Sequence, residues 1–599
     1  MPTVDESVVA ALYGAMRAEN ERKRQEAQAV ATLWPEAVAR LLVLRGVREL
    51  DDARRLLRPQ LAQLTPPEAL TDLPRAAERL VEALRRGERV MVHGDYDVDG
   101  ICSTALLTRM LRAMGGDAEP FIPERKADGY DLGPAGVRAA IAMQAKLVLT
   151  CDCGTTALEP ARALAAQGID LIVTDHHRPQ AELPVALAVV NPQREAELET
   201  RGDRALAAVG VAWKLMAAVL EMRGGDISEA ERTELRALLD AQLELVALAT
   251  VADVAALVGD NRIFVAEGLK RMAKAPAPGM PDRRNRGLRA LIRSAGLDDK
   301  RLTAGRLGFV VAPRLNALGR IRHARDGVKL LLADDDSVAM DLAVECNRAN
   351  DERQLKDRDI LAQAQRKLEQ IDIDAARGIV LHGDGWEPGV IGIVASRVVE
   401  LTHRPTFMIA VGQDGGARVG KGSGRSIPGF DLHAALTSCG DLLMKYGGHR
   451  AAAGLTIAAE NIEAFAERFD QAAASALSEE QLVPELKPDL ELPIAQADES
   501  LLEALRFLEP FGMGNPGPVL LSRGVPLKGG ARSVGSDGLK LEFASEGGPR
   551  EAIGWGLASR APEVPRDGKV DILYRLEMNE FRNARTLQAN ILDLRRSDA

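Results

Sequence analysis

Short apolar runs alternate with Ala- and Leu-rich stretches between residues 89 and 191. The runs lie at 90–93, 121–123, 147–151, 171–175 and 189–191. Strands that alternate with helices build a parallel, doubly wound sheet, and such sheets bind ligands at the carboxyl ends of their strands. The pattern therefore predicts an α/β domain whose chemistry lies at one edge of a mostly parallel sheet.

The rest of the chain is organised differently. Residues 1–85 have the composition of charged, Ala/Leu-rich helices. Residues 328–377 contain neither Gly nor Pro, which favours one helix of about 35 residues and about 50 Å at ~1.5 Å per residue. Two shorter helices with a polar break are the alternative. A second α/β block begins at Gly378 and includes a predicted helix near 390–401.

The last part of the chain is rich in Gly and Pro and has alternating runs at 539–543 and 570–578, which predict a small antiparallel barrel or sandwich. We therefore predict five parts. They are an N-terminal helical segment (1–85), a catalytic α/β domain (86–330), a connecting helix (331–372), a smaller α/β domain (373–478) and a β-barrel domain (479–599). Residues 477–499 have the composition of a linker.

The composition is that of a globular protein, with 46% hydrophobic and 27% charged residues. The sequence has no window of ~18 uncharged apolar residues and no basic, then apolar, leader, so we expect neither a membrane span nor a signal peptide. Its five cysteines lack CxxC spacing. They argue against a disulfide framework and fit a reducing cytoplasm.

The segment His93-Gly-Asp95-Tyr-Asp97-Val-Asp99-Gly100 directly follows the first predicted strand. Alternate residues of an extended chain point the same way, so these carboxylates would crowd together. Crowded carboxylates raise one another's pKa and cost free energy unless a cation neutralises them. An acidic surface turn is the alternative to a metal site.

Two further strand ends and one apolar helix add the same chemistry. Asp152 follows the run 147–151, and Asp175-His176-His177 ends the run 171–175. Asp253 is the only charge in the segment 245–258, where a buried carboxylate is costly unless it is paired or bound to metal. A helix N-cap is the alternative role for Asp253. Mixed carboxylate and imidazole ligands suit Mn²⁺, and Mg²⁺ less well, and two such ions catalyse in-line displacement at phosphorus.

Candidate phosphate-binding residues follow the same logic. Guanidinium groups, amides and hydroxyls all donate hydrogen bonds to phosphate oxygens. The alternative for each arginine is an ordinary solvated surface residue, and the alternative for each glycine-rich loop is a simple hairpin. The candidates are Arg125, Arg314, Asn316, Arg320, and Ser423 and Arg425 of a predicted flexible loop at 422–426. A further candidate is His449, in a turn that we expect to precede a helix of small residues.

His93-x-x-x-Asp97-x-Asp99, Asp152, Asp175-His176-His177 and Asp253 together resemble the DHH phosphoesterase superfamily. The stretches 383–392, 422–426, 447–454 and 507–516 resemble the RecJ family of single-strand-specific 5′→3′ DNA exonucleases within it. This resemblance, from residue 89 to the C-terminus, implies DHH, DHHA1-like and OB-fold-like domains. It also implies one or two Mn²⁺ ions, with Mg²⁺ as an alternative.

The resemblance also implies roles for individual residues. One ion would be held by Asp99, Asp152, His176 and Asp253, and a second by His93, Asp97 and Asp152. The catalytic residues would be Asp97, Asp152 and His177, which would act on the reacting phosphate, while Asp95 and Asp175 would orient ligands. Arg125, Ser423 and Arg425 would grip the 5′-terminal phosphate, and Arg314, Asn316 and His449 would contact the scissile phosphate and its neighbours.

The implied function is removal of nucleotides from the 5′ end of single-stranded DNA in repair and recombination, by a monomer that a helicase and a single-strand-binding protein assist. A small-nucleotide phosphodiesterase, acting on nanoRNA or a cyclic dinucleotide, and a non-catalytic replication scaffold are the alternatives. The connecting helix and about 100 additional C-terminal residues favour a polymer substrate.

The net charge of −10 argues against a nucleic-acid partner at first sight. However, residues 301–330 carry seven basic side chains and one acidic one, a local charge of 7 − 1 = +6. We therefore expect DNA contact in an interior groove rather than over the whole surface.

Overall fold

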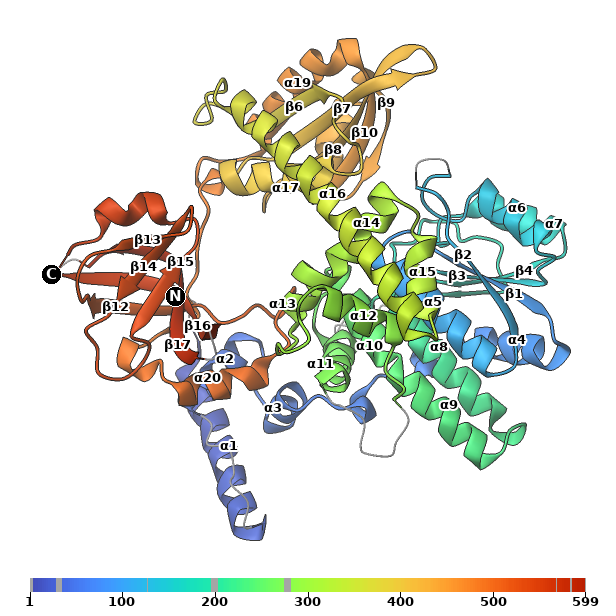
Figure 1. Cartoon of the computed structure of the whole chain (residues 1–599), viewed down its shortest axis with the longest axis horizontal. Helices are drawn as coiled ribbons and strands as arrows, with labels where there is room; N and C mark the ends of the chain where they lie inside the picture. The colour runs from blue at the N-terminus through green and yellow to red at the C-terminus, as the bar shows by residue number, and fades with distance from the viewer. Residues whose placement is uncertain are drawn as a thin grey trace.

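The computed structural model describes residues 4–27, 35–125, 128–194, 203–273, 282–566, 568–581 and 584–597. Three sheets organise these residues, and each is covered by helices (Figure 1). Among the described residues, no helix has both the length and the apolar character that crossing a bilayer requires.

The first sheet is entirely parallel and has the strand order β2-β1-β3-β4-β5. Its strands are β1 (Arg89–Gly94), β2 (Asp117–Phe121), β3 (Leu147–Cys151), β4 (Asp170–Thr174) and β5 (Ala188–Val190). Helices α4 (Leu73–Arg86), α5 (Val98–Ala113) and α8 (Ala208–Met222) contribute to the large core on one face, and α6 (Pro134–Ala142) and α7 (Leu158–Ala166) to a smaller core on the other. The predicted doubly wound α/β domain is confirmed.

The prediction of a strand at 121–123 is wrong in position. Strand β2 ends at Phe121, where the apolar run begins. Its sequence, Asp-Ala-Glu-Pro-Phe, gives a weak strand signal because it contains two acids and a proline. β2 is an edge strand, and an edge is where a sheet tolerates proline.

Further helices enlarge the first domain. They are α9 (Glu229–Ala241), α10 (Leu243–Ala252), α11 (Gly259–Ala273), α12 (Arg286–Ser294), α13 (Ala304–Arg306), α14 (Ala312–Ile321) and α15 (Arg325–Leu332), with a π-helical turn, η7 (Leu307–Val311), between α13 and α14. Helix α16 (Asp336–Leu368) is a single 33-residue helix. Ala339 and Ala343 in its first half pack in the core of the first domain, whereas Ile360 and Ala364 pack in a core of the second.

The second sheet has the order β6-β7-β8-β10-β9; β6 pairs parallel with β7, and the other three pairings are antiparallel. Its strands are β6 (Ile379–Asp384), β7 (Thr406–Asp414), β8 (Ala417–Arg425), β9 (Leu443–Gly448) and β10 (Ala452–Ala458). The accompanying helices are α17 (Ile391–Thr402), α18 (Leu432–Ser438) and α19 (Ile462–Ala476).

Two local predictions in this domain are wrong. The predicted flexible loop at 422–426 is largely strand β8, where a Cβ on Gly424 would lie 2.4 Å from the Phe407 ring, so the glycine permits close packing. The predicted helix after His449 is strand β10. Ala453, Leu455 and Ile457 are buried in alternation, and this period of two is obscured in the sequence by small residues.

The C-terminal sheet has seven strands in the order β11-β12-β16-β17-β15-β14-β13. They are β11 (Leu490–Glu491), β12 (Leu520–Pro526), β13 (Arg532–Val534), β14 (Gly538–Glu542), β15 (Glu551–Gly554), β16 (Lys569–Phe581) and β17 (Ala584–Arg596). The predicted linker at 477–499 is partly wrong, because Leu490 and Ile494 are buried in the core of this domain.

The N-terminal helices belong to the C-terminal sheet rather than to the catalytic domain that follows them in sequence. Helices α1 (Glu6–Ala27), α2 (Glu36–Leu44) and α3 (Leu50–Leu57) share one hydrophobic core with the sheet and with α20 (Glu499–Leu505). The two ends of the chain therefore form one folded unit. It contacts the first domain through Leu257, whose backbone N–H donates to the Met513 carbonyl at 2.7 Å.

Candidate metal centre and phosphate site

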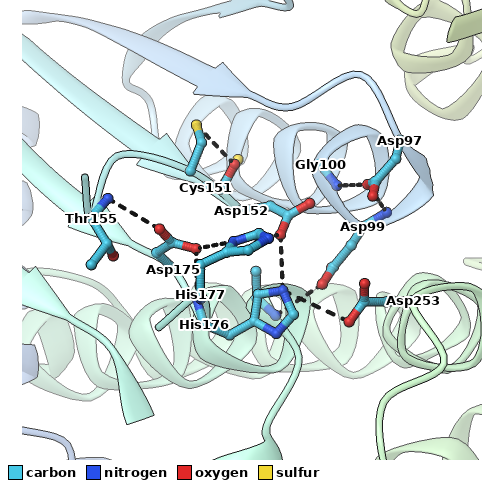
Figure 2. Close-up of polar contacts among 12 residues, drawn as sticks. Asp97, Asp99, Gly100, Cys151, Asp152, Thr155, Asp175, His176, His177 and Asp253 are labelled. Carbon is cyan, nitrogen blue, oxygen red and sulfur yellow. Dashed lines mark hydrogen bonds and ion pairs between the residues drawn. The ribbon is translucent and has the colours of Figure 1, made fainter. Parts of the chain in front are cut away.

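The carboxyl ends of the parallel strands bring the predicted metal ligands together (Figure 2). Asp152 directly follows β3, and His176 and His177 follow β4. Asp97 is the N-cap of α5, where its carboxylate accepts hydrogen bonds from the backbone N–H groups of Asp99 and Gly100. Asp253 is the C-cap residue of α10, so the alternative of a helix N-cap is wrong.

Three groups of side chains each place one ligand atom per residue within 4.8 Å of the others. They are Asp152–His176–His177, Asp99–His176–Asp253 and Asp95–Asp97–Asp152. His176 Nε2 lies 3.1 Å from Asp152 Oδ1 and 3.7 Å from Asp253 Oδ2. Asp152 has a left-handed φ of 62°, which is uncommon outside glycine and concentrates at functional sites. The shared residues Asp152 and His176 link the three groups into one cluster.

Burial makes the charged carboxylates of this cluster costly. It raises the pKa of Asp152 and Asp95 well above the usual value, and the neighbouring Asp97 carboxylate adds to the effect. Burial and then Asp97 likewise raise the pKa of Asp99 to about 7. A divalent cation among these oxygens would supply the missing countercharge.

The donor atoms left without hydrogen bonds fit a metal ion. His93 Nε2, Asp95 Oδ1, Asp152 Oδ1 and His176 Nε2 are all buried and lack a hydrogen-bond partner. Burial lowers the pKa of both His93 and His176 to about 4, which leaves their imidazoles neutral, as metal ligands must be. Buried polar atoms are rarely left without a hydrogen bond, so the three that belong to the cluster, on Asp95, Asp152 and His176, indicate a ligand.

His177 is held differently from His176. Its Nδ1 lies 2.8 Å from Asp175 Oδ1, and the Tyr130 hydroxyl lies 3.0 Å from its Nε2. Burial opposes a charge on His177, but the hydrogen bond and charge of Asp175 outweigh it and raise the pKa of His177 to about 9. Asp175 also accepts from the backbone N–H of His176 at 2.7 Å, which fits its expected role in orienting ligands.

The structure departs from the expected ligand sets at three residues. His177, expected to act on the phosphate, lies in one of the three groups. Asp95, expected to orient ligands, lies in one of the three groups, whereas His93 lies in none of them. His93 is fully buried, with Nδ1 3.5 Å from Cys153 Sγ. Tyr130 was missed altogether, because a lone tyrosine in a glycine-containing loop gives no signal in the sequence.

The phosphate candidates Arg125, Arg320, Ser423 and Arg425 come together between the first two domains. Burial lowers the pKa of Arg320 to about 10, and the charges of Arg125, Arg353 and Arg425 add to this. Arg425 donates to Ser423 Oγ at 3.2 Å, and Arg320 donates to the Gly389 carbonyl at 2.6 Å. A buried Arg320 with three further guanidinium charges near it forms a candidate site for an anion.

A cavity of about 600 Å³ opens beside this site and is lined by Tyr96, Arg125 and Arg320, among others. The Arg125 guanidinium lies 4.9 Å from the centre of the Tyr96 ring, which leaves its N–H groups available to a ligand. Arg353 of α16 was not predicted, since it lies in a helix whose sequence indicates only a connector.

The remaining phosphate candidates, Arg314, Asn316 and His449, are not among the residues that come together at this site. Arg314 donates from Nε to Asn347 Oδ1 at 2.6 Å and from Nη1 to the Val310 carbonyl, so its guanidinium is engaged within the protein. Asn316 is half-buried on α14. His449 is exposed in the turn between β9 and β10.

Comparisons with known proteins agree with this architecture. Residues 89–250 match the DHH family, N-terminal domain; residues 375–475 match the DHHA1 domain; and residues 488–593 match the RecJ OB domain. The parallel sheet with its Asp-His-His cluster and the second α/β domain thus define a DHH-family protein that carries a DHHA1 domain.

Two relatives narrow the class further. The single-stranded-DNA-specific exonuclease RecJ of Salmonella typhimurium is 35% identical over 97% of this chain and 100% of its own length, and that of Thermus thermophilus is 37% identical over 96% and 77%. The crystal structure of Thermus thermophilus RecJ with Mn²⁺ matches with a TM-score of 0.77 at 33% identity, over 97% of this chain and 78% of that one. The structure with Mg²⁺ matches with a TM-score of 0.72 at 31% identity, over 97% and 77%. The chain belongs to the RecJ family of single-stranded-DNA-specific exonucleases.

Proposed function

We propose that this protein hydrolyses phosphodiester bonds at the 5′ end of single-stranded DNA, in repair and recombination, with one or two divalent ions that are preferentially Mn²⁺. The observation that carries the proposal is the buried cluster of Asp95, Asp97, Asp99, Asp152, His176 and Asp253, with its unpaired donor atoms beside a site rich in arginine. Relatives crystallised with Mn²⁺ and with Mg²⁺ support a divalent ion.

The side chains of the two sites would have different roles in the reaction. Asp152 and His176, which each belong to two of the three groups, would help to hold the ions, and bound ions would supply an activated water and countercharge for the phosphate oxygens. His177 holds a proton that Asp175 stabilises, and would donate a hydrogen bond to the reacting phosphate. Arg125, Arg320, Ser423 and Arg425 would bind the 5′-terminal phosphate and so select the end of the strand.

The setting of the enzyme is also part of the proposal. The five cysteines are unpaired and buried, which fits a reducing cytoplasm. We expect a monomer that acts on strands exposed by a helicase and covered by a single-strand-binding protein. The C-terminal sheet would hold the strand mainly through its backbone charge.

A 5′-phosphorylated oligonucleotide of ~40 nucleotides tests this function against that of a small-nucleotide phosphodiesterase. We expect degradation in Mn²⁺, none in a chelator, and at least a 1,000-fold loss in the variant Asp152→Ala, because the variant lacks a carboxylate that two of the three groups share and would bind the ions weakly. Thermal melting checks that the variant stays folded. Turnover of dinucleotides alone, or activity of Asp152→Ala within tenfold of wild type, would contradict the proposal.

A further inference from the structure

Phe309 is the most exposed of the large hydrophobic side chains among the described residues, with 88% of its surface accessible. It lies in the middle of the π-helical turn η7, between Leu307 and Val311, which are both fully buried. The buried neighbours fix the turn against the core, so the phenyl ring is held outward on a rigid element. Single-turn π-helices are frequently found at functional sites.

The turn packs on the helix that supplies a candidate metal ligand. A Cβ on Gly308 would lie 3.0 Å from Val251 Cγ1, in the last turn of α10, and Asp253 caps the same helix. The next residue, Val254, is 60% exposed and has a left-handed φ of 57°. A β-branched residue in this conformation is a genuine outlier. Two exposed apolar side chains therefore lie beside the Asp253 end of the metal centre.

Helix α14 connects this apolar region with the phosphate site. It begins directly after η7 and reaches Arg320, eleven residues beyond Phe309, or about 16 Å at ~1.5 Å per residue. Near its end, a Cβ on Gly319 would lie 2.4 Å from the backbone oxygen of Tyr96, the residue before Asp97. One helix therefore passes the metal centre with the arginine site at one end and Phe309 at the other.

Positive charge continues beyond the phenyl ring. A cavity of about 380 Å³ between α13 and β16 is lined by Arg306, Arg506 and Arg575, together with Arg301, Glu509 and Glu577. Arg301 is paired with Glu509. Arg506 is likewise paired with Glu503, and Arg306 donates to the Arg301 carbonyl. The charges of Arg306 and Arg575 would still attract a DNA backbone that leaves the metal centre in this direction.

The geometry points to Phe309 as a base-stacking contact for single-stranded DNA on the 3′ side of the scissile phosphate. This inference rests on the proposed function: with the 5′ phosphate at Arg320 and Arg425, and the scissile bond at the metal centre, the strand passes Phe309 next. An aromatic face stacks on any base, so the contact is independent of sequence. It requires an unpaired base, so it also favours single strands over duplexes.

Single abasic sites at nucleotides two to five of an oligonucleotide test this contact. We expect one position at which an abasic site raises the KM of the wild-type enzyme roughly tenfold, since base stacking contributes about 1–3 kcal/mol and 1.4 kcal/mol is tenfold. Phe309→Ala should raise KM on the intact strand by the same factor, leave kcat within about threefold, and make the enzyme insensitive to that abasic site.

Three further variants separate stacking from a structural role. Phe309→Leu keeps an apolar side chain without a flat ring and should behave like Phe309→Ala, whereas Phe309→Tyr should restore the wild-type KM. Leu401→Ala, which removes another exposed apolar side chain (58%) on α17, should change nothing. The leucine and tyrosine variants decide the matter if Phe309→Ala fails to fold.

Three outcomes would overturn the stacking contact. They are additive effects of Phe309→Ala and the abasic site on KM, an unchanged KM in Phe309→Ala, and a wild-type KM in Phe309→Leu. Each of these outcomes would leave the proposed function standing if the wild-type enzyme degrades the intact strand. Failure of the wild-type enzyme to degrade any single strand would instead remove the proposed function itself.

Discussion

The metal centre and the phosphate site of this protein are assembled in different ways. The candidate ligands of the metal centre, from Asp95 to Asp253, all belong to one domain, and most of them converge because parallel strands share a carboxyl edge. The phosphate site draws Arg125 and Arg320 from one domain and Arg425 from another, 300 residues along the chain from the first. Local topology creates the first site, whereas the second depends on how two domains pack.

Two experiments test this difference between the sites. The larger expected effect is on substrate preference and comes from a variant of the phosphate site. We expect Arg425→Ala to lower the preference for a 5′-phosphorylated over a 5′-hydroxyl strand by roughly 10- to 100-fold, since a charge-assisted hydrogen bond contributes about 1.5–3 kcal/mol. The measurement is the ratio of kcat/KM values for the two strands. Arg418→Ala is the matched control, because Arg418 lies on the same strand and pairs with Asp384 at the surface. An unchanged ratio in Arg425→Ala would show that the domains do not form a joint 5′ site.

The metal centre gives the smaller effect, on stability. Burial and neighbouring charge raise the pKa of Asp99 to about 7, so the folded, metal-free protein holds protons more tightly than the unfolded chain. That contribution is fully present below the unfolded pKa, near 4, and is lost as the pH rises through about 7. Mn²⁺ replaces the protons, so it should raise the melting temperature by a few degrees more at pH 8 than at pH 5.5.

Melting curves with and without Mn²⁺ at the two pH values check this expectation. Asp152→Asn is the control, because it removes one charge from the cluster at constant volume and should make the metal-free protein less sensitive to pH. A metal-free melting temperature that rises between pH 5.5 and pH 8 while Mn²⁺ gives equal stabilisation at both would contradict the account of the cluster.

The same contrast explains how far the sequence predicts the structure. Asp152 and the pair His176 and His177 stand directly after apolar runs, so their convergence follows from the strand pattern alone. Arg353 carries no such signal, since its proximity to Arg320 depends on the packing of α16 against the first domain. The sequence of the N-terminal helices likewise does not indicate where they pack, because their partners in the C-terminal core lie more than 400 residues away.

Secondary structure was predicted least well where small residues or prolines replaced the usual strand formers. Gly424 and Ala453 lie in adjacent antiparallel strands, although their surroundings in the sequence are typical of a loop and a helix. The requirement for glycine there comes from the Phe407 ring of the next strand, a tertiary contact. Local propensity is a weak guide at such positions.

The central claim is that a metal-dependent centre and a separate 5′-phosphate site act on one single strand. The most direct measurement labels the same 5′-phosphorylated strand at its 5′ end or at its 3′ end and follows the release of each label in Mn²⁺. The account predicts that the 5′ label is released first, as a mononucleotide, and that the 3′ label stays in shortening strands until late. Early release of the 3′ label, or release of either label without a divalent ion, would contradict it.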